Sequence, residues 1–485
     1  MRQIIKYICC GVCILQIFTG IVVAKQNKTS KNIFVQRPLF QYTFITTPQI
    51  YSQKCISSGL TAIGMYEKSI PDCRQSRYFL FDCKDALSIV GTSDQISQTV
   101  QENRDISLTW LDYAHDIAPD TTNNFFSLSP HTKTYGALLS YFKTFDLPID
   151  LFKDSWIGVS AYVQSITNHL ELSTNGNAEQ TNVISELFNQ SDWQYAKVAP
   201  CACRKTAIPE IKATFGSTIF DCDNLLVQYV SSLYIPTSDK QNPEYMFSPS
   251  VGKNKHWGIE VQLLSTIPLI DGDFCPLNFF SYLSNVFYIR RTHHRTFDLL
   301  KKPYSRYMLL RKEGHQETVP AMNLLTLPCK VKTSNCADIS FGLNYQAPCF
   351  GCSFGYNLWV HPTEKIFIHA PYCSEYREKY RNIYPFEEYG IAGSDKDHSA
   401  SHATIRDIAF DDHNDDETFT TIKQSDLDLH SPAGQGGSTN TVFGFITLNT
   451  PSKHCNFHLG GYYSAAYINT SMSAWGGFFT LQADF

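Results

Sequence analysis

Beyond its N-terminal end, the sequence lacks any apolar run of about 18 residues, the length that a helix needs to cross a bilayer. A membrane-spanning segment would therefore have to be a strand. The sequence also lacks a glycine-rich phosphate loop, an HExxH motif and a Gly-x-Ser-x-Gly motif, which are signatures of common enzymes. Lys and Arg (40) do not exceed Asp and Glu (45), so the net charge of −5 gives no basic surface for nucleic acid. These absences favour a protein that is not an enzyme, has no cofactor and has no nucleic-acid partner.

The N-terminal end has the pattern of an export signal. Arg2 and Lys6 flank the start of the chain, residues 8–21 form an apolar stretch, and Val22-Val23-Ala24 offers a peptidase site. We predict a signal peptide over residues 1–24 that is cleaved after Ala24. An uncleaved anchor helix is the alternative.

The main signal in the rest of the chain is alternation with a period of two, in segments separated by turn residues. Such segments suit membrane strands with one apolar and one small or polar face. The alternation is clearest at residues 157–164, 257–263, 339–346, 350–361, 454–467 and 477–485, and weaker at residues 135–145, 225–235, 277–289, 304–311 and 442–448. These segments predict about eleven strands after residue 127, and a closed barrel of this kind usually has an even number.

We therefore predict an all-β fold, a single antiparallel transmembrane β-barrel of about 12 strands (range about 10 to 14) with long loops on one rim. Unpaired backbone groups are costly in hydrocarbon, so the sheet must close on itself. The barrel is expected over residues 127–485, with loop inserts at 173–224, which includes a helix-like stretch at 179–189, and at 371–440. Residues 25–126 are expected to form first strands, for which 39–46 and 106–113 are candidates, or a plug or a periplasmic extension.

The last eleven residues, WGGFFTLQADF, resemble the C-terminal strand of bacterial outer-membrane proteins. Gly477, Phe479, Leu481, Ala483 and Phe485 share one face, and the strand ends in Phe as in that class. The resemblance implies that the protein lies in the cell outer membrane and contacts its lipids. It also implies that the barrel-assembly machinery reads Phe479, Leu481, Ala483 and Phe485.

Cysteine is abundant: Cys9, Cys10 and Cys13 lie in the signal, and 13 of the 16 cysteines follow it. In an exported protein these thiols can oxidise. Possible loop staples join Cys73 with Cys83, Cys201 or Cys203 with Cys222, Cys329 with Cys336, and Cys349 with Cys352, but connectivity cannot be read from sequence. A redox role for Cys349 and Cys352 is disfavoured, because such motifs open a helix and this one lies among strand residues.

Positive charge gathers at Arg290, Arg291, His293, His294 and Arg295. In the lumen or on the rim, this cluster would favour anionic solutes by focusing the electric field. A charged rim in contact with water or lipid head groups is the more ordinary interpretation. A metal site is disfavoured, because His293 and His294 would point to opposite faces of a strand.

Two polar segments contain side chains that could form a metal site or a catalytic site. The acidic run at residues 411–417 offers oxygen ligands for Ca²⁺ but lacks the spacing of an EF-hand, so it is interpreted as a solvated loop. Residues 398–402 (HSASH) contain a nucleophile and a base without an orienting acid. Neither segment predicts a metal or a catalytic residue.

The leading hypothesis is a passive outer-membrane pore or a transporter of small solutes. The alternative is a filled, non-conducting barrel with a surface-structural or adhesive role. A secreted, disulfide-rich β protein with no membrane phase is a third possibility.

Overall fold

The computed structural model describes residues 30–46, 58–72, 75–112, 116–145, 147, 153–222, 224–270, 276–312, 314–315, 317–333, 335–368, 385–392, 402–409, 420–450, 455–467 and 470–485. Twelve antiparallel strands form one ring, in which β1 pairs with both β4 and β23, so the sheet closes without a free edge. In order around the ring these strands are β1 (Ser58–Ile70), β4 (Asn123–Phe145), β5 (Lys153–Thr174), β7 (Glu210–Cys222), β8 (Leu225–Pro236), β9 (Gly258–Ile270), β10 (Leu277–Tyr288), β16 (Cys336–Gln346), β17 (Phe350–His361), β21 (Gly437–Asn449), β22 (Cys455–Ala466) and β23 (Ser473–Asp484). The predicted closed barrel is confirmed.

Several strand assignments from the sequence need correction. The barrel, expected over residues 127–485, also includes β1, which lies well before residue 127. Residues 304–311 were predicted to form a wall strand, but they contain the 3-10 helix η4 (Ser305–Tyr307) and the start of β13 (Leu309–Lys312), which lies outside the ring. Strand β7 belongs to the ring although it lies within the predicted loop insert 173–224. A bulge between Thr218 and Phe220 interrupts its alternation, which explains why the pattern did not indicate a strand.

The outer face of the ring is an apolar belt. Leu139 is 55% exposed, Ile157 53% and Phe354 64%, whereas the adjacent Leu138, Trp156 and Ser353 are buried on the inner face. Tyr66 and Trp475 also lie on this face, with their ring centroids 5.5 Å apart. A continuous apolar band with aromatic side chains near its edge is the lipid-facing surface of an outer-membrane β-barrel. No helix within the described ranges is both long and apolar enough to cross a bilayer.

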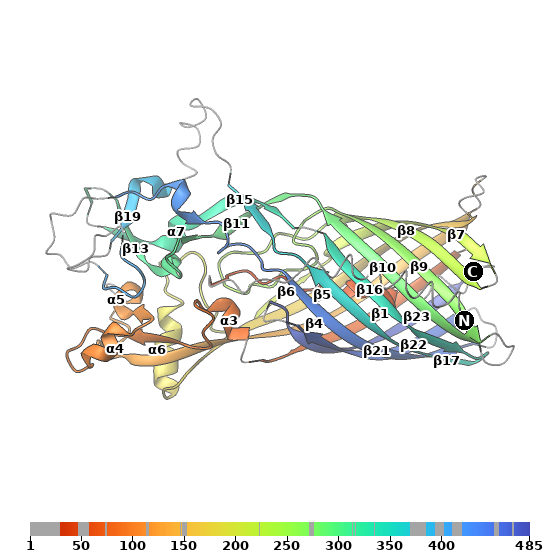
Figure 1. Cartoon of the computed structure of the whole chain (residues 1–485), viewed down its shortest axis with the longest axis horizontal. Coiled ribbons are helices and arrows are strands. Elements are labelled where there is room, and N and C mark those ends of the chain that lie inside the picture. The colour runs from red at the N-terminus through yellow and green to blue at the C-terminus, as the bar shows by residue number, and fades with distance from the viewer. Residues whose placement is uncertain are drawn as a thin grey trace, which may run out of the picture.

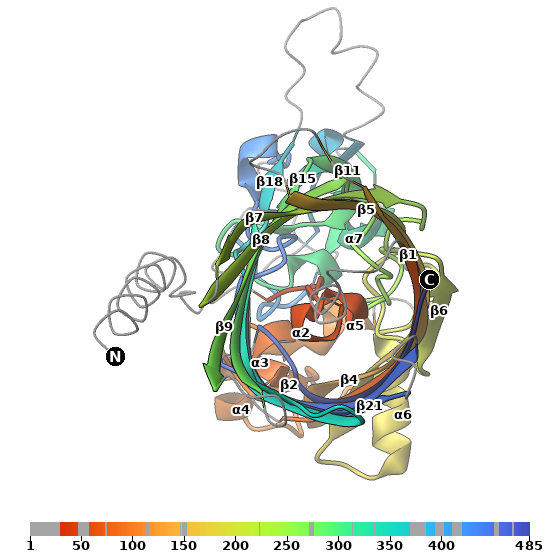
Figure 2. The same ribbon diagram turned by 90° about the vertical axis from the view of Figure 1, so that its right-hand side faces the viewer.

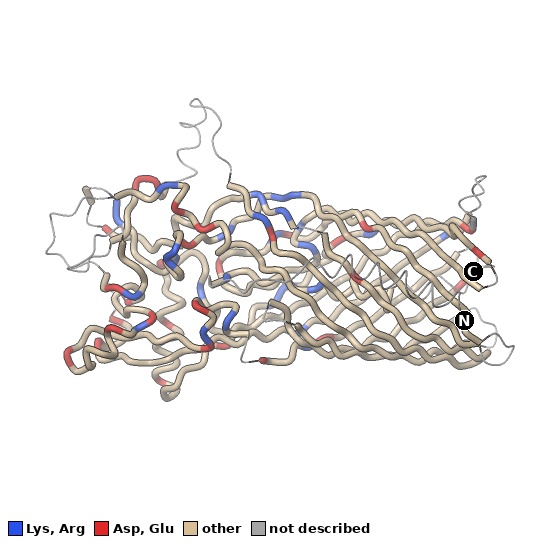
Figure 3. The backbone as a smooth tube through the Cα atoms, in the orientation of Figure 1, with Lys and Arg blue, Asp and Glu red and all other residues tan. Residues whose placement is uncertain are grey.

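The connections between strands are short at the end that holds the C-terminus and long at the other end (Figure 1). The described parts of the long connections, in residues 71–122, 175–209, 237–257, 289–335 and 362–436, fold together with the one short connection at this end, 467–472, into what we call the loop domain. Figure 3 shows that Lys, Arg, Asp and Glu gather in this domain and in the adjoining end of the barrel. The predicted asymmetry of the two rims is therefore present.

The loop domain has its own apolar core, in which Trp110, Phe188 and Met322 are almost fully buried. Its strands are β2 (Leu87–Val90), β3 (Ile106–Ser107), β6 (Cys203–Ala207), β11 (Arg291–Thr296), β12 (Asp298–Leu299), β13, β14 (Thr318–Pro320), β15 (Thr326–Lys332), β18 (Lys365–Phe367), β19 (Tyr389–Ile391) and β20 (Leu427–Asp428). Its helices are α3 (Ser76–Phe79), α4 (Gln98–Glu102), α5 (Leu108–Leu111), α6 (Ala178–Leu187), α7 (Ala321–Leu325), η4, η6 (Pro385–Glu388) and η7 (Gln424–Asp426). Residues 106–113 are a candidate wall strand from the sequence, but their described part, 106–112, contains β3 and α5 and lies outside the ring.

The insert at 371–440 was interpreted as a solvated loop, and this holds only in part. Phe386, Ile405 and Leu427 are buried in the core of the loop domain. The acidic run 411–417 and residues 398–401 lie outside the described residues, and His402 is exposed.

The suggested disulfide staples among described cysteines are not formed. The thiols concerned are unpaired in this structure: Cys201, Cys203, Cys222, Cys329, Cys336, Cys349 and Cys352. The signal peptide and Cys73 lie outside the described residues.

Candidate functional site: a plugged lumen

Residues 30–46 run from the loop domain into the lumen of the barrel, and we call them the plug. They include η1 (Leu39–Gln41) and α2 (Thr43–Thr46). Figure 2 shows α2 inside the ring of strands. Leu39, Phe44 and Ile45 are each at most 2% exposed, and they pack against inward-facing side chains of the wall. The suggestion that residues 39–46 form a wall strand is therefore wrong.

Aromatic contacts hold the end of the plug that lies deepest in the lumen. The ring of Phe44 is stacked on the ring of Phe443, with centroids 3.8 Å apart and an interplanar angle of 2°. The ring of Tyr42 packs on the ring of Tyr462, with centroids 4.6 Å apart. Burying one such side chain stabilises the plugged arrangement by about 1.5 to 3 kcal/mol.

Glycines in the wall allow these inward-facing rings to lie flat against it. A Cβ added to Gly355 would lie 2.6 Å from Cζ of Phe443, and one added to Gly476 would lie 2.3 Å from Cζ of Tyr462. Real Cβ atoms do not approach other atoms so closely, so a larger residue would push each ring away. The glycines on the inward face thus shape the space that the plug fills.

A buried ion pair fixes the middle of the plug. The guanidinium of Arg37 pairs with Asp338 on β16, and its Nη1 donates to Oδ1 of Asn357 at 2.8 Å. The side chains of Arg37 and Asp338 are only 5% and 8% exposed. Oγ1 of Thr43 also donates to Oδ1 of Asp338 at 2.7 Å. Removing one partner of such a pair leaves an uncompensated buried charge, which is strongly destabilising.

The hydroxyls of two tyrosines converge on one wall carboxylate. Tyr42 of the plug and Tyr462 of β22 both donate to Oε2 of Glu67, at 2.5 Å and 2.7 Å. Both tyrosine hydroxyls are thereby hydrogen-bonded, as buried polar groups require. The plug is complementary to the wall in its polar groups as well as its apolar ones.

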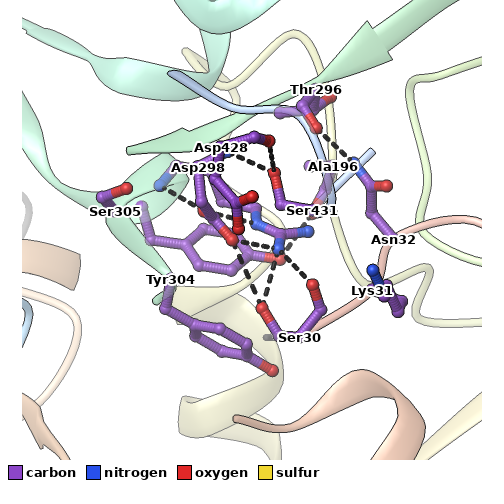
Figure 4. Close-up of polar contacts among 12 residues, drawn as sticks. Ser30, Lys31, Asn32, Ala196, Thr296, Asp298, Tyr304, Ser305, Asp428 and Ser431 are labelled. Carbon is purple, nitrogen blue, oxygen red and sulfur yellow. Dashed lines mark hydrogen bonds and ion pairs between the residues drawn. The ribbon is translucent and has the colours of Figure 1, made fainter. Parts of the chain in front are cut away.

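The start of the plug is fixed in the loop domain (Figure 4). Nη2 of Arg306 donates to Oγ of Ser30 at 2.8 Å and to Oδ2 of Asp298 at 2.5 Å, and Nε of Arg306 donates to Oδ1 of Asp298 at 3.0 Å. Arg306 and Asp298 are 0% and 1% exposed. Burial disfavours the charged guanidinium, but the Asp298 carboxylate outweighs burial and raises the pKa of Arg306. We call Ser30, Asp298 and Arg306 the latch.

Several cavities lie along the lumen: one contacts Phe40 and Thr46 of the plug, and two others lie towards the two ends of the lumen. Of these two, one of about 150 Å³ lies towards the C-terminal rim and is lined by hydrogen-bonding groups with aromatic neighbours, among them Asn278, Asn344, His458 and Gln482. The other, of about 70 Å³, lies between the plug and the loop domain. Residues 39–46 therefore occupy the stretch of lumen between two spaces that a small solute could enter.

The structure separates the predicted basic cluster. On β11, His293 and Arg295 are buried at 2% exposure each, whereas Arg291 and His294 are exposed, as Arg290 is just before the strand. Successive side chains of a strand point to opposite faces, which explains why His293 and Arg295 are buried while Arg291 and His294 are exposed. Arg295 lies in the wall of the smaller cavity.

The predicted assembly residues lie on the outer face of β23 and at its end. Phe479, Leu481 and Phe485 are 51%, 52% and 68% exposed, and Ala483 shares their face. The plug contacts were missed at the sequence level. One available signal was Phe478, an aromatic residue on the otherwise polar face of its strand, which is only 5% exposed and belongs to the cluster around the plug.

No protein-family model matches the sequence, and no curated protein matches it either. Among solved structures, an outer-membrane channel from Pseudomonas putida F1 is 7% identical with a TM-score of 0.38 over 90% of this chain and 99% of that one. A mutant of the TodX monoaromatic hydrocarbon channel is 9% identical, with a TM-score of 0.34 over 91% and 94%. The outer-membrane protease OmpT of Escherichia coli is 7% identical, with a TM-score of 0.23 over 89% and 98%. These similarities are too low to transfer a function.

Proposed function

We propose that this protein is an outer-membrane channel for small solutes whose lumen is closed by its own N-terminal plug. The observation that supports this is the burial of residues 39–46 between two cavities inside a closed barrel. Conduction requires that this part of the plug leave the lumen or shift within it. We assign the chain no catalytic residue and no cofactor.

The orientation follows from the asymmetry of outer-membrane barrels, which have short periplasmic turns and longer extracellular loops. The loop domain would then face outward. A signal peptide cleaved after Ala24 would leave a mature chain that begins shortly before the latch residue Ser30. Phe479, Leu481, Ala483 and Phe485 would present the outer face of β23 to the assembly machinery, and deletion of Phe485 should lower the yield of heat-modifiable barrel in outer-membrane fractions.

A second candidate is a non-conducting barrel with a surface-structural or adhesive role. The closed lumen and the separate core of the loop domain favour it. In that case the plug is a permanent part of the core of the barrel, and weakening it destabilises the protein without opening a path.

The conductance of the Arg37→Ala variant in planar bilayers distinguishes the channel from the non-conducting barrel. Loss of the guanidinium leaves Asp338 unpaired in the lumen, at a cost of about 3 to 5 kcal/mol to the plugged state. We expect channel openings to be more frequent than in the wild type. Arg77→Ala is the matched control, because it removes an ion pair to Asp85 (Nε to Oδ1, 2.6 Å) whose side chains are 35% and 51% exposed.

Conductance in Arg77→Ala should equal that of the wild type. If Arg37→Ala forms folded, heat-modifiable barrels that never conduct at any voltage, the channel proposal fails and the structural role is favoured.

A further inference from the structure

The cavity of about 70 Å³ at the junction of plug, barrel and loop domain contains an excess of positive charge. Its wall includes Gln36 of the plug, Lys253 of the β8 to β9 connection, Arg295 of β11 and Glu364 of the β17 to β21 connection. Two cations and one carboxylate therefore face the same small space. Charge that is buried without a partner is costly unless a counter-charge approaches it.

Lys253 is the less well compensated of the two cations. Its ammonium group makes no hydrogen bond or ion pair with any residue that the structure describes. The ring of Tyr288 lies near, with Nζ 5.1 Å from the centroid, and the wall carboxylates Glu210 and Glu260 act on the ammonium from farther away. The nearby wall carboxylate Glu260 is already engaged, because its Oε2 lies 2.8 Å from Nζ of Lys212 and accepts from Tyr234 at 2.7 Å. The ammonium is thus available to a ligand.

Arg295 is also incompletely paired. Its Nη2 lies 3.4 Å and 3.2 Å from the two oxygens of Glu364, which are long separations for a charged pair, and its buried Nε has no hydrogen-bond partner among the described residues. Oε2 of Glu364 also accepts from the backbone N–H of Gly434 at 2.9 Å. One guanidinium donor is left for another acceptor.

The histidines beside the cavity do not add charge at neutral pH. Burial lowers the pKa of His256, which lies in the cavity wall. Burial and the adjacent Arg295 lower the pKa of His293 to about 2, and the two rings meet through their Nε2 atoms at 3.0 Å. The charged side chains that line the cavity therefore sum to one positive unit, from Lys253 and Arg295 against Glu364, while Glu210 and Glu260 act on Lys253 from outside the lining.

We propose that this cavity binds one small monocarboxylate. A carboxylate balances the single excess charge and accepts from an ammonium and a guanidinium N–H, the charge-assisted pairing that these groups favour. Ile33, Phe34 and Trp359 form the apolar part of the wall, which suits a short aliphatic tail. The volume exceeds the roughly 10 to 15 Å³ that a single water needs, so a ligand of a few heavy atoms fits.

Because residues 33–38 supply part of the wall, the site exists only while this part of the plug is in place. A ligand that binds one state stabilises that state, so the carboxylate would hold the plug closed. Binding itself does not depend on whether the barrel conducts, so this proposal and the proposed function can fail separately.

The test is saturation-transfer NMR on the full-length barrel in detergent, with propionate as the probe and propionamide as its neutral counterpart. At pH 7 we expect propionate to give a signal and propionamide none. Lys253→Gln should bind propionate about tenfold more weakly or worse, through loss of a charged donor. Lys255→Gln is the matched control, since Lys255 is 34% exposed and lies outside the cavity wall.

A pH series on the wild-type protein gives a measurement that needs no variant. Burial lowers the pKa of Lys253 to about 8, and bound propionate would raise it, so binding should persist at pH 7 and fall as the pH rises through and above 8. The other groups that act on this ammonium are Tyr288, Cys336, Glu210, Glu260 and Arg37. Equal signals from propionate and propionamide, or binding by Lys253→Gln equal to that of the wild type, would show that the cavity holds only water.

Discussion

Phe44→Ala is the sharpest test of the idea that the plug closes the lumen. The Phe44 side chain is 1% exposed, and its ring is stacked on that of Phe443 with centroids 3.8 Å apart. Truncation of a buried phenylalanine typically costs about 3 to 5 kcal/mol, because apolar burial is lost and a cavity is left behind. If only the plugged state loses this contact, the equilibrium shifts towards the open state by roughly a hundredfold to a few thousandfold.

The assay is single-channel recording together with liposome swelling in neutral sugars. We expect Phe44→Ala to conduct far more often than the wild type. Phe354→Ala removes the same side chain from the lipid-facing surface, where it is 64% exposed, and should leave conductance unchanged. Heat-modifiable migration in detergent gels confirms that each variant is a closed barrel. A folded Phe44→Ala barrel as silent as the wild type, or a wild type as conductive as the variant, would refute the reasoning.

Two other changes test the wall and the latch. Gly355→Ala places a Cβ where the ring of Phe443 lies, so it should displace the ring without a change in the plug sequence. We expect a higher open probability in the same single-channel recordings. An unchanged open probability would mean that the stacked ring does not hold the plug. Arg306→Met leaves the Asp298 carboxylate buried without its partner, at a cost of about 3 to 5 kcal/mol. The loop domain should then be cut by protease at concentrations that spare the wild type, while the barrel remains heat-modifiable; equal resistance would show that the latch is not needed for its stability.

The barrel could be predicted from the sequence because a wall strand has two unlike neighbours. Lipid on one side and lumen on the other produce a period of two, and Phe479 and Leu481 on β23 face outward as that period requires. The pattern failed where this condition does not hold. In β1, the inward side chains Ile63 and Met65 are apolar because they face the plug cluster, so the two faces look alike.

The plug could not be distinguished from a strand for a similar reason. Residues 39–46 alternate in the same way, but they are surrounded by the wall, and the side chains of both sets are buried. The latch and the role of Lys253 were beyond reach because they join distant parts of the chain, whereas Arg295 was already marked by the basic cluster. Arg306 meets Ser30 across 276 positions, and no local pattern marks such a pair.

The two ends of the plug are held by different interactions, and this bears on how the proposed channel would open. The latch end is joined to the loop domain by a fully buried charge network, and removing it would break apart the core of that domain. The deep end is held mainly by ring contacts and one ion pair to the wall. Residues 39–46 can therefore be displaced while Ser30 remains in place. A hinge within residues 33–36, which line the smaller cavity, would be enough to open the lumen without unfolding the loop domain.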